Sequence, residues 1–254
     1  MIEIRGKVAL ITGGAKRIGR AIGLRLAREG AHVVFTYLRS ASEAEATRRE
    51  IEAMGVRAGA VQADLSRPET YDRLIDEARK AVGDIDVLIN SASEFPRTGL
   101  DQLSADRAAF DRSFQSLTDL HVRAPLYLGM RLGLEMRKRG FGRIVNITDR
   151  VVARSQAYGG WPIYQVTKYA LHGVTQVLAQ ALAPEVTVNA IAPGLVIPPD
   201  GFPADELAAL LKKIPLGRAV GPEEIAEDVV HLVRSQSKTG STLLSDGGSS
   251  MRTF

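Results

Sequence analysis

Two side chains spaced four residues apart, Tyr164 and Lys168, have the clearest capacity for chemistry in this chain of 254 residues. They lie in a segment, 164–182, whose apolar residues recur with the period of an α-helix. Residues four apart share one face of a helix, so we expect the phenol and the ammonium group to act together. A nearby cation favours the phenolate and lowers a tyrosine pKa from its ordinary value of about 10. The pair therefore predicts a proton donor that works near neutral pH while a cofactor supplies hydride.

A glycine-rich turn near the amino terminus has the composition of a dinucleotide site. The residues TGGAKRIG occupy positions 12–19, between an apolar run of strand length and a helix-like segment. Gly13 permits a tight turn, and Gly19 lets the helix pack close to the sheet. The start of the helix then offers unpaired backbone N–H groups to a pyrophosphate. We therefore expect Gly13, Arg17, Ile18 and Gly19 to bind the cofactor.

The residues after the second strand favour NADPH over NADH. A site for NAD places Asp or Glu about 20 residues beyond the glycines, bonded to the ribose hydroxyls. This chain has no acid there; the sequence TYLRS at 36–40 instead offers Arg39 and Ser40. A cation and a hydroxyl at this point, with the guanidinium of Arg17, suit a 2′-phosphate. The alternative is that Arg17 and Arg39 are solvated surface residues.

The candidate catalytic and cofactor residues must be positioned by helices and strands. Along the whole chain, short apolar runs alternate with segments of helical period. The predicted strands are 8–12, 31–36, 58–63, 87–90, 143–148 and 186–191, with a plausible further strand at 241–244. The predicted helices are 17–28, 42–54, 68–82, 164–182 and 223–234, and 105–139 is long enough for one helix or two joined ones. The most loop-like stretch, 192–204, is rich in proline and glycine.

This alternation predicts an α/β fold. We expect a single-domain, Rossmann-type, doubly wound parallel sheet of about seven strands with helices on both faces, spanning residues 1–254. In such folds ligands bind at the carboxyl ends of the strands. The glycine turn and the segment after the second strand both follow predicted strands, so they are expected at that edge.

Composition and charge exclude several other classes. The chain is 45% hydrophobic and 24% charged, and no apolar run is long enough for a membrane span. The net charge is +4, and the basic residues that produce it are expected to lie on a solvated surface, with a polyanion-binding face as the alternative. These basic residues do not interleave with aromatic residues as they do in nucleic-acid binders. The scattered histidines and the lack of cysteine predict neither a metal site nor disulfides. No signal peptide precedes the first strand, so a cytoplasmic location is expected.

Together these features resemble the short-chain dehydrogenase/reductase family. The glycine turn, Tyr164 with Lys168 and the segments after the strands match the family pattern from Gly6 to about Gly248. The resemblance implies that Lys168 also bonds the nicotinamide ribose. It further implies that the cofactor contacts Asp64, Leu65, Asn90, Ser91, Ala92, Pro193 and Gly194, in addition to Tyr164 and Lys168.

Three positions depart from the family pattern. Arg17 replaces the middle glycine of the turn, and Asp149 stands where the family has serine after the fifth strand. Asp149 is therefore the third catalytic candidate; its alternative role is to cap a turn after the strand, in which case Thr148 is the backup hydroxyl. His121 replaces the family's structural asparagine, either as part of a proton relay or as a buried, hydrogen-bonded histidine.

The departures resemble one branch of the family, the pteridine and dihydromonapterin reductases. In that branch an aromatic residue at the position of Phe95 stacks on the pterin, and a serine at the position of Ser93 contacts it. A flat, electron-poor ring gains from stacking, and its ring N–H and amino groups need acceptors, which Asp149 could supply. The resemblance implies NADPH-dependent reduction of a dihydropterin-type substrate. Hydride goes to the carbon of a ring C=N bond, and Tyr164 protonates the nitrogen directly or through water.

Two other functions stay open at this point. A 3-oxoacyl-thioester or other carbonyl reductase would require a serine where Asp149 stands. A non-catalytic NADP(H) sensor would keep Arg17 and Arg39 without needing Tyr164 and Lys168. Family members are commonly homotetramers that meet through the two long central helices, so a homotetramer is expected, although the apolar faces of those helices could equally be core.

Overall fold

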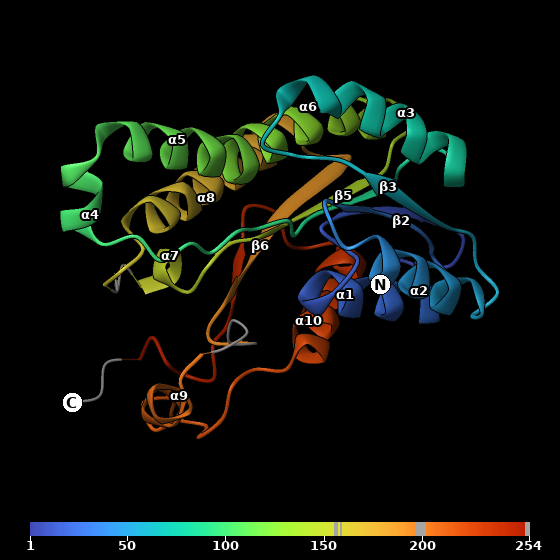
Figure 1. The fold of residues 1–254 in the computed structure, drawn as a ribbon. Helices are drawn as coiled ribbons and strands as arrows, with labels where there is room; N and C mark the ends of the chain where they lie inside the picture. The colour runs from blue at the N-terminus through green and yellow to red at the C-terminus, as the bar shows by residue number, and fades with distance from the viewer. Residues whose placement is uncertain (155–156, 158, 197–201, 252–254) are drawn as a thin grey trace.

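The structure, a computed structural model, describes residues 1–154, 157, 159–196 and 202–251 and has one seven-stranded sheet (Figure 1). Its strands are all parallel and lie in the order β3-β2-β1-β4-β5-β6-β7. This is the strand order of a doubly wound Rossmann sheet with one more strand at its edge, so the predicted fold class is confirmed. The strands are β1 (Val8–Thr12), β2 (His32–Tyr37), β3 (Ala58–Gln62), β4 (Val87–Asn90), β5 (Gly142–Ile147), β6 (Val186–Pro193) and β7 (Thr242–Ser245).

In the described residues the predicted helices are all present, together with three further helices that were not predicted. The predicted ones are α1 (Arg17–Arg28), α2 (Ala41–Glu52), α3 (Tyr71–Val82), α5 (Arg107–Thr118), α6 (Ala124–Lys138), α8 (Pro162–Leu182) and α10 (Pro222–Arg234). A short 3₁₀ turn, Pro68–Thr70, precedes α3, so the segment predicted as one helix from 68 is divided. The additional helices are α4 (Leu100–Ala105), α7 (Val151–Arg154) and α9 (Ala204–Leu211), all in segments that were expected to be loops or too irregular to interpret.

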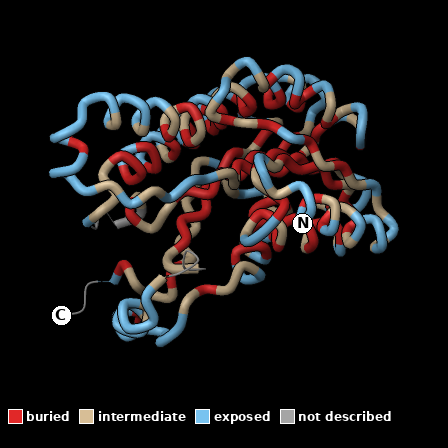
Figure 2. The backbone as a smooth tube through the Cα atoms, in the orientation of Figure 1, coloured by how far each residue is buried: buried red, intermediate tan, exposed pale blue. Residues whose placement is uncertain are grey.

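Helices cover both faces of the sheet because successive side chains of each strand point to opposite sides. On one face Ile11 of β1 packs with α1, α2 and α10, and on the other Leu10 packs with α3, α6 and α8. Figure 1 shows these two layers below and above the strands, and Figure 2 shows that the strands and the inward turns of the helices are the buried parts. The two cores fix the carboxyl ends of the strands at one edge.

The long segment between β4 and β5 contains a local irregularity that bears on the site. Helices α5 and α6 are joined by a π-helical turn, Asp119–Arg123, so the segment predicted as one helix or two is two. A π turn inserts one residue per turn and changes the direction of the side chains that it carries. Here it buries His121, whose exposed fraction is 1%.

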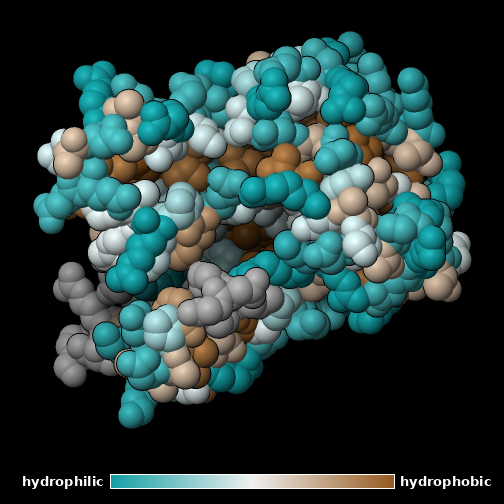
Figure 3. All heavy atoms as spheres, viewed as in Figure 1, coloured by the Kyte–Doolittle hydropathy of each residue, from teal (hydrophilic) through white to brown (hydrophobic). Residues whose placement is uncertain are grey.

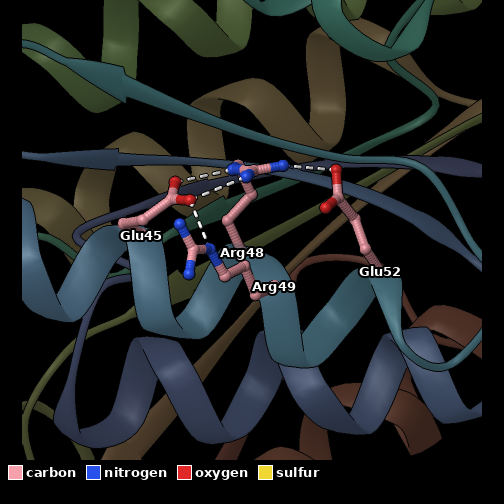
Figure 4. Close-up of polar contacts among 4 residues, drawn as sticks. All are labelled: Glu45, Arg48, Arg49 and Glu52. Carbon is pink, nitrogen blue, oxygen red and sulfur yellow. Dashed lines mark hydrogen bonds and ion pairs between the residues drawn. The ribbon is translucent and has the colours of Figure 1, made fainter.

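The outer face of α2 shows how part of the positive charge is used. Arg48 contacts both Glu45 and Glu52, and Arg49 contacts Glu45 (Figure 4). Ion pairs this exposed add little to stability, but they place carboxylates against both guanidinium groups. This face of α2 is therefore not a bare cationic surface. None of the helices in the part of the chain that the structure describes has the length and apolar character needed to cross a bilayer.

Candidate active site

A cavity of about 1380 Å³ lies at the carboxyl ends of the strands. A hollow with apolar residues at its floor is visible near the centre of the face drawn in Figure 3. The volume exceeds the ~300–1,000 Å³ of a typical small-molecule site, so a dinucleotide and a second molecule can share it. Of the predicted site residues, those that line it are Gly13, Arg17, Ile18, Gly19, Arg39, Ser40, Asp64, Leu65, Ser91, Ala92, Ser93, Phe95, Asp149, Tyr164, Lys168, Pro193 and Gly194.

Asn90 is the one predicted site residue that does not line this cavity. Its side chain is buried and donates a hydrogen bond to Oδ1 of Asn146 at 2.8 Å. Asn146 in turn donates to the hydroxyl of Thr175 on α8 at 2.9 Å. Asn90 thus lies in a polar network that ties β4 and β5 to the helix bearing Tyr164, below the cavity rather than in it.

The glycine turn brings backbone segments so close together that Gly13 and Gly19 leave no space for a side chain. A Cβ on Gly13 would lie 2.8 Å from Cα of Ala92, and a Cβ on Gly19 would collide with the carbonyl oxygen of Gly13. The hydroxyl of Thr12 accepts hydrogen bonds from the N–H groups of Ser91 and Ala92, both at 3.0 Å, and so holds the two strand-end turns together. The residues present fit a pyrophosphate at the start of α1.

Basic side chains gather at the end of the cavity formed by β1 and β2. Lys16, Arg17 and Arg39 are exposed and line it. Arg17 has φ of 57°, in the left-handed region that favours glycine, so its backbone is strained at the position where the family pattern has glycine. Arg39 lies 3.9 Å from the carboxylate of Glu94. These cations fit a phosphate on an adenosine ribose better than they fit ribose hydroxyls.

The structure brings Tyr164 and Asp149 together at the floor of the cavity. The phenol of Tyr164 donates a hydrogen bond to Oδ2 of Asp149 at 3.3 Å. Oδ1 of Asp149 accepts from the N–H of Val151 at 2.9 Å, which caps the short helix α7. Asp149 therefore fills the turn-capping role considered as an alternative, and that cap aims its other oxygen at Tyr164.

Lys168 lies beneath the phenol ring and is buried, with an exposed fraction of 2%. Its ammonium group donates to the carbonyl oxygen of Ile147 at 2.9 Å and lies 5.5 Å from the centroid of the Tyr164 ring. Burial lowers the pKa of Lys168 to about 8, and the negative charge of Asp149 partly opposes that fall. A cation is therefore present beside the phenol at neutral pH.

Aromatic side chains form one wall above the phenol. Phe95 stacks on Trp161 with centroids 4.7 Å apart and contacts Tyr164 edge-on at 4.6 Å. Trp161 was not among the predicted site residues, although it lies three residues before Tyr164 at the start of α8. Its position directly before the helix that carries the pair was the signal that could have identified it. One face of Phe95 is thus already occupied by Trp161.

A chain of hydrogen bonds runs from the cavity into the protein behind the phenol. Ser93 lines the cavity, and its hydroxyl lies 3.0 Å from Nε2 of His121. Nδ1 of His121 lies 2.8 Å from the hydroxyl of Thr167. His121 is therefore a buried, hydrogen-bonded histidine, and it does not line the cavity. The hydroxyl of Thr148 donates to the carbonyl of Ile191 at 2.9 Å, so it faces β6 rather than the phenol.

Residues of α9 and its flanks, including Phe202, Glu206 and Lys213, close the far side of the cavity. The segment 195–207 was expected to influence the choice of substrate, but the individual residues were not identified because the prolines obscure the start of this helix. Part of the loop-like stretch 192–204, namely 197–201, lies outside the described residues. Within the described ranges no group of three or more His, Asp or Glu side chains is placed to hold a metal ion.

Comparison with known proteins gives consistent matches over almost the whole chain. Residues 13–250 match the family model described as enoyl-(acyl carrier protein) reductase. The 3-oxoacyl-[acyl-carrier-protein] reductase FabG of Staphylococcus epidermidis is 31% identical, over 95% of this chain and 98% of that protein. FolM alternative dihydrofolate reductase 1 from Brucella canis, solved in complex with NADP, is 34% identical with a TM-score of 0.86, over 99% of this chain and 97% of that one. A short-chain dehydrogenase/reductase from Serratia marcescens is 32% identical with a TM-score of 0.87, over 98% of this chain and all of that one.

Proposed function

Because the chain belongs to the short-chain dehydrogenase/reductase family, we propose that it reduces a dihydropterin-type heterocycle with NADPH. The observation that carries this proposal is the Asp149 carboxylate, which lines the cavity and accepts the hydrogen bond of Tyr164. An ionised carboxylate only accepts hydrogen bonds. It therefore favours a ring with N–H and amino donors over a carbonyl oxygen, which it would repel.

The cofactor is NADP(H), which the FolM structures from Brucella contain. When bound, it supplies the hydride. The turn that begins at Gly13 and the start of α1 would hold its pyrophosphate, and Arg17, Arg39 and Ser40 would hold a 2′-phosphate. Asp64 and Leu65 would border the adenine, and Lys168 the nicotinamide ribose.

The chain's own residues then have four tasks in the reaction. Tyr164 holds the proton that the reduced nitrogen must receive, directly or through water. Lys168 keeps a positive charge beside that phenol and so stabilises the phenolate left behind. Asp149 orients the phenol and the heterocycle together, because a carboxylate can accept from both. The aromatic wall of Phe95 and Trp161 offers a flat apolar surface to the ring.

A second candidate function, reduction of a carbonyl such as a 3-oxoacyl thioester, is favoured by the 3-oxoacyl-[acyl-carrier-protein] reductase relatives. The experiment that tests both is NADPH oxidation followed by absorbance, with dihydrobiopterin and dihydrofolate in parallel with simple ketones and an acetoacetyl thioester. We expect turnover with a dihydropterin or dihydrofolate and little with the carbonyl compounds. The opposite ranking would replace the proposal by the carbonyl reductase, and cofactor binding without any turnover would favour a sensor.

Exchange of Arg17 for glycine separates cofactor recognition from backbone strain. Arg17→Gly removes a charged donor to the 2′-phosphate, a contact worth about 1.5–3 kcal/mol, so the Kd for NADPH should rise about 10- to 150-fold. The same change relieves the positive φ, so the melting temperature should not fall. Arg17→Ala is the matched control, with the same loss of affinity and no relief of strain. Unchanged NADPH affinity in both variants would remove Arg17 from the cofactor site.

The pKa of Lys168 predicts how kcat/KM for NADPH depends on pH. Its ammonium form is present below about pH 8 and is lost as the pH rises through that value. We therefore expect kcat/KM for NADPH, which reports the free enzyme, to fall above about pH 8. In Asp149→Asn the charge that raises the pKa of Lys168 is gone, so the fall should move to lower pH. A profile that stays flat through this range, or one that the substitution leaves in place, would contradict this assignment.

We also propose a homotetramer that assembles through α5 and α8. The outer face of α8 exposes Val166 and Val177, by 56% and 61%, and α5 exposes the stacked pair Phe110 and Phe114. Val177→Arg should place a charge in that contact and reduce the mass measured by light scattering to that of a dimer or monomer. Ala46→Arg, on the exposed face of α2, is the control and should leave the mass unchanged. Equal masses for both variants would argue against this interface.

A further inference from the structure

The hydroxyl of Thr167 fixes the direction of the hydrogen bonds behind the phenol. It lies 2.8 Å from the backbone carbonyl of Tyr164, to which it must donate because a carbonyl oxygen only accepts. This is the common bond of a threonine hydroxyl back to its own helix. A hydroxyl has a single proton, so Thr167 can only accept from its other neighbour. That neighbour is Nδ1 of His121, at 2.8 Å.

His121 must therefore carry its proton on Nδ1. Burial, with the nearby Lys168 cation as a second cause, holds the pKa of His121 well below its ordinary value, so the ring is neutral. A neutral imidazole protonated at Nδ1 has a lone pair at Nε2. The group facing that lone pair at 3.0 Å is the hydroxyl of Ser93. Ser93 must donate there, since two lone pairs would otherwise oppose each other at hydrogen-bond distance.

Ser93 thus has no proton left for a molecule in the cavity. The other acceptor near its hydroxyl, the carbonyl oxygen of Glu94, is more distant at 3.5 Å. We propose that His121 is a positioning residue that turns Ser93 into an obligate hydrogen-bond acceptor and thereby selects a substrate that presents an N–H or amino donor at this point. The proposal rests on the proposed function, since it takes Ser93 to be a substrate contact. It adds that the substrate is the donor and Ser93 the acceptor in the hydrogen bond between them.

The placement of His121 restricts it to this indirect role. The residue is 1% exposed and does not line the cavity, so it cannot touch the substrate itself. The π turn between α5 and α6 directs its ring inward, where it bridges Ser93 after β4 and Thr167 on α8. A proton relay through this ring would need a proton on Thr167 that is already bonded to the helix backbone. Two acceptors, Ser93 and Asp149, then line the cavity, which suits a heterocycle with several N–H groups.

The tautomer can be measured without any substrate. In protein labelled with ¹⁵N histidine and saturated with NADPH, the His121 signals are identified by their absence from His121→Asn. We expect the neutral Nδ1–H tautomer, with the Nε2 nitrogen unprotonated. An Nε2–H tautomer or an imidazolium would overturn the proposal whether or not the protein reduces pterins, so this failure is distinct from failure of the proposed function.

The selection role is tested by a double-mutant cycle in dihydrobiopterin reduction and binding. Asn places an amide nitrogen near the position of Nδ1 but does not reach Ser93, so His121→Asn should raise the KM several-fold to about tenfold while kcat changes less. Ser93→Ala should do the same, and the double variant should be no worse than Ser93→Ala alone. Binding is read independently from the fluorescence of Trp161, the only tryptophan. Additive losses, or a His121→Asn effect on NADPH affinity equal to that on the pterin, would show a structural role instead and overturn the proposal.

Discussion

Tyr164→Phe is expected to lower kcat for the reduced heterocycle by about 10²- to 10⁴-fold, the range typical of removing a positioned general acid. The substitution deletes only the hydroxyl that donates to Asp149 at 3.3 Å, and the ring keeps its edge contact with Phe95. Tyr164 is one of many residues that line the cavity, so the Kd for NADPH should change little. Single-turnover kinetics measured at saturating NADPH would check the chemical step directly.

The matched control for this variant is Tyr169→Phe on the same helix. Tyr169 donates its hydroxyl to the carbonyl of Val151, outside the cavity, so its removal should leave kcat within a few-fold of the parent. If Tyr164→Phe also kept its turnover, the proton would have to come from another group. Ser93 is not expected to supply it, because its hydroxyl is proposed to donate to His121.

The fold could be predicted almost completely because its signals are local. β1 and β4 are short apolar runs that end at Thr12 and Asn90, and both were predicted at their observed bounds. Helix α1 follows the glycine turn directly and was also predicted to the residue. Helix α9 escaped prediction because its sequence follows a proline-rich stretch, and helix α7 because four residues carry no periodic signal.

The residues of the candidate site could be predicted from the sequence only where they directly follow a predicted strand. Asp149 and Gly194 follow strands and line the cavity as expected, whereas Asn90 ends a strand and is turned into the protein. Whether a strand-end side chain faces the cavity depends on its partners across the sheet, here Asn146, which a single sequence does not pair with it. The direction of the His121 hydrogen bonds depends likewise on Thr167, 46 residues away.

Asp149→Ser is the substitution that best distinguishes a dihydropterin reductase from a carbonyl reductase. We expect kcat/KM for a dihydropterin to fall about 10- to 150-fold, the equivalent of one hydrogen bond to a charged group at about 1.5–3 kcal/mol. Reduction of a ketone or a 3-oxoacyl thioester should be unchanged or should rise, because a serine hydroxyl can donate to a carbonyl oxygen and a carboxylate cannot. Parallel NADPH-oxidation assays of both substrate classes on parent and variant measure this change in ranking.

The effect of Asp149→Ser on activity can be interpreted because serine can still accept the hydrogen bond that holds α7 in place. Oδ1 of Asp149 caps the N–H of Val151, and a serine hydroxyl caps such groups as well as aspartate does, so α7 should keep its position. Asp149→Asn keeps the size and the cap but replaces one acceptor oxygen by a donor, so it should also lower kcat/KM for a dihydropterin, and it should accept a ketone better than the parent does. If instead Asp149→Ser reduced dihydropterins as well as the parent, the carboxylate would not be recognising the heterocycle. The site would then be better described as that of a carbonyl reductase, as in the FabG relatives.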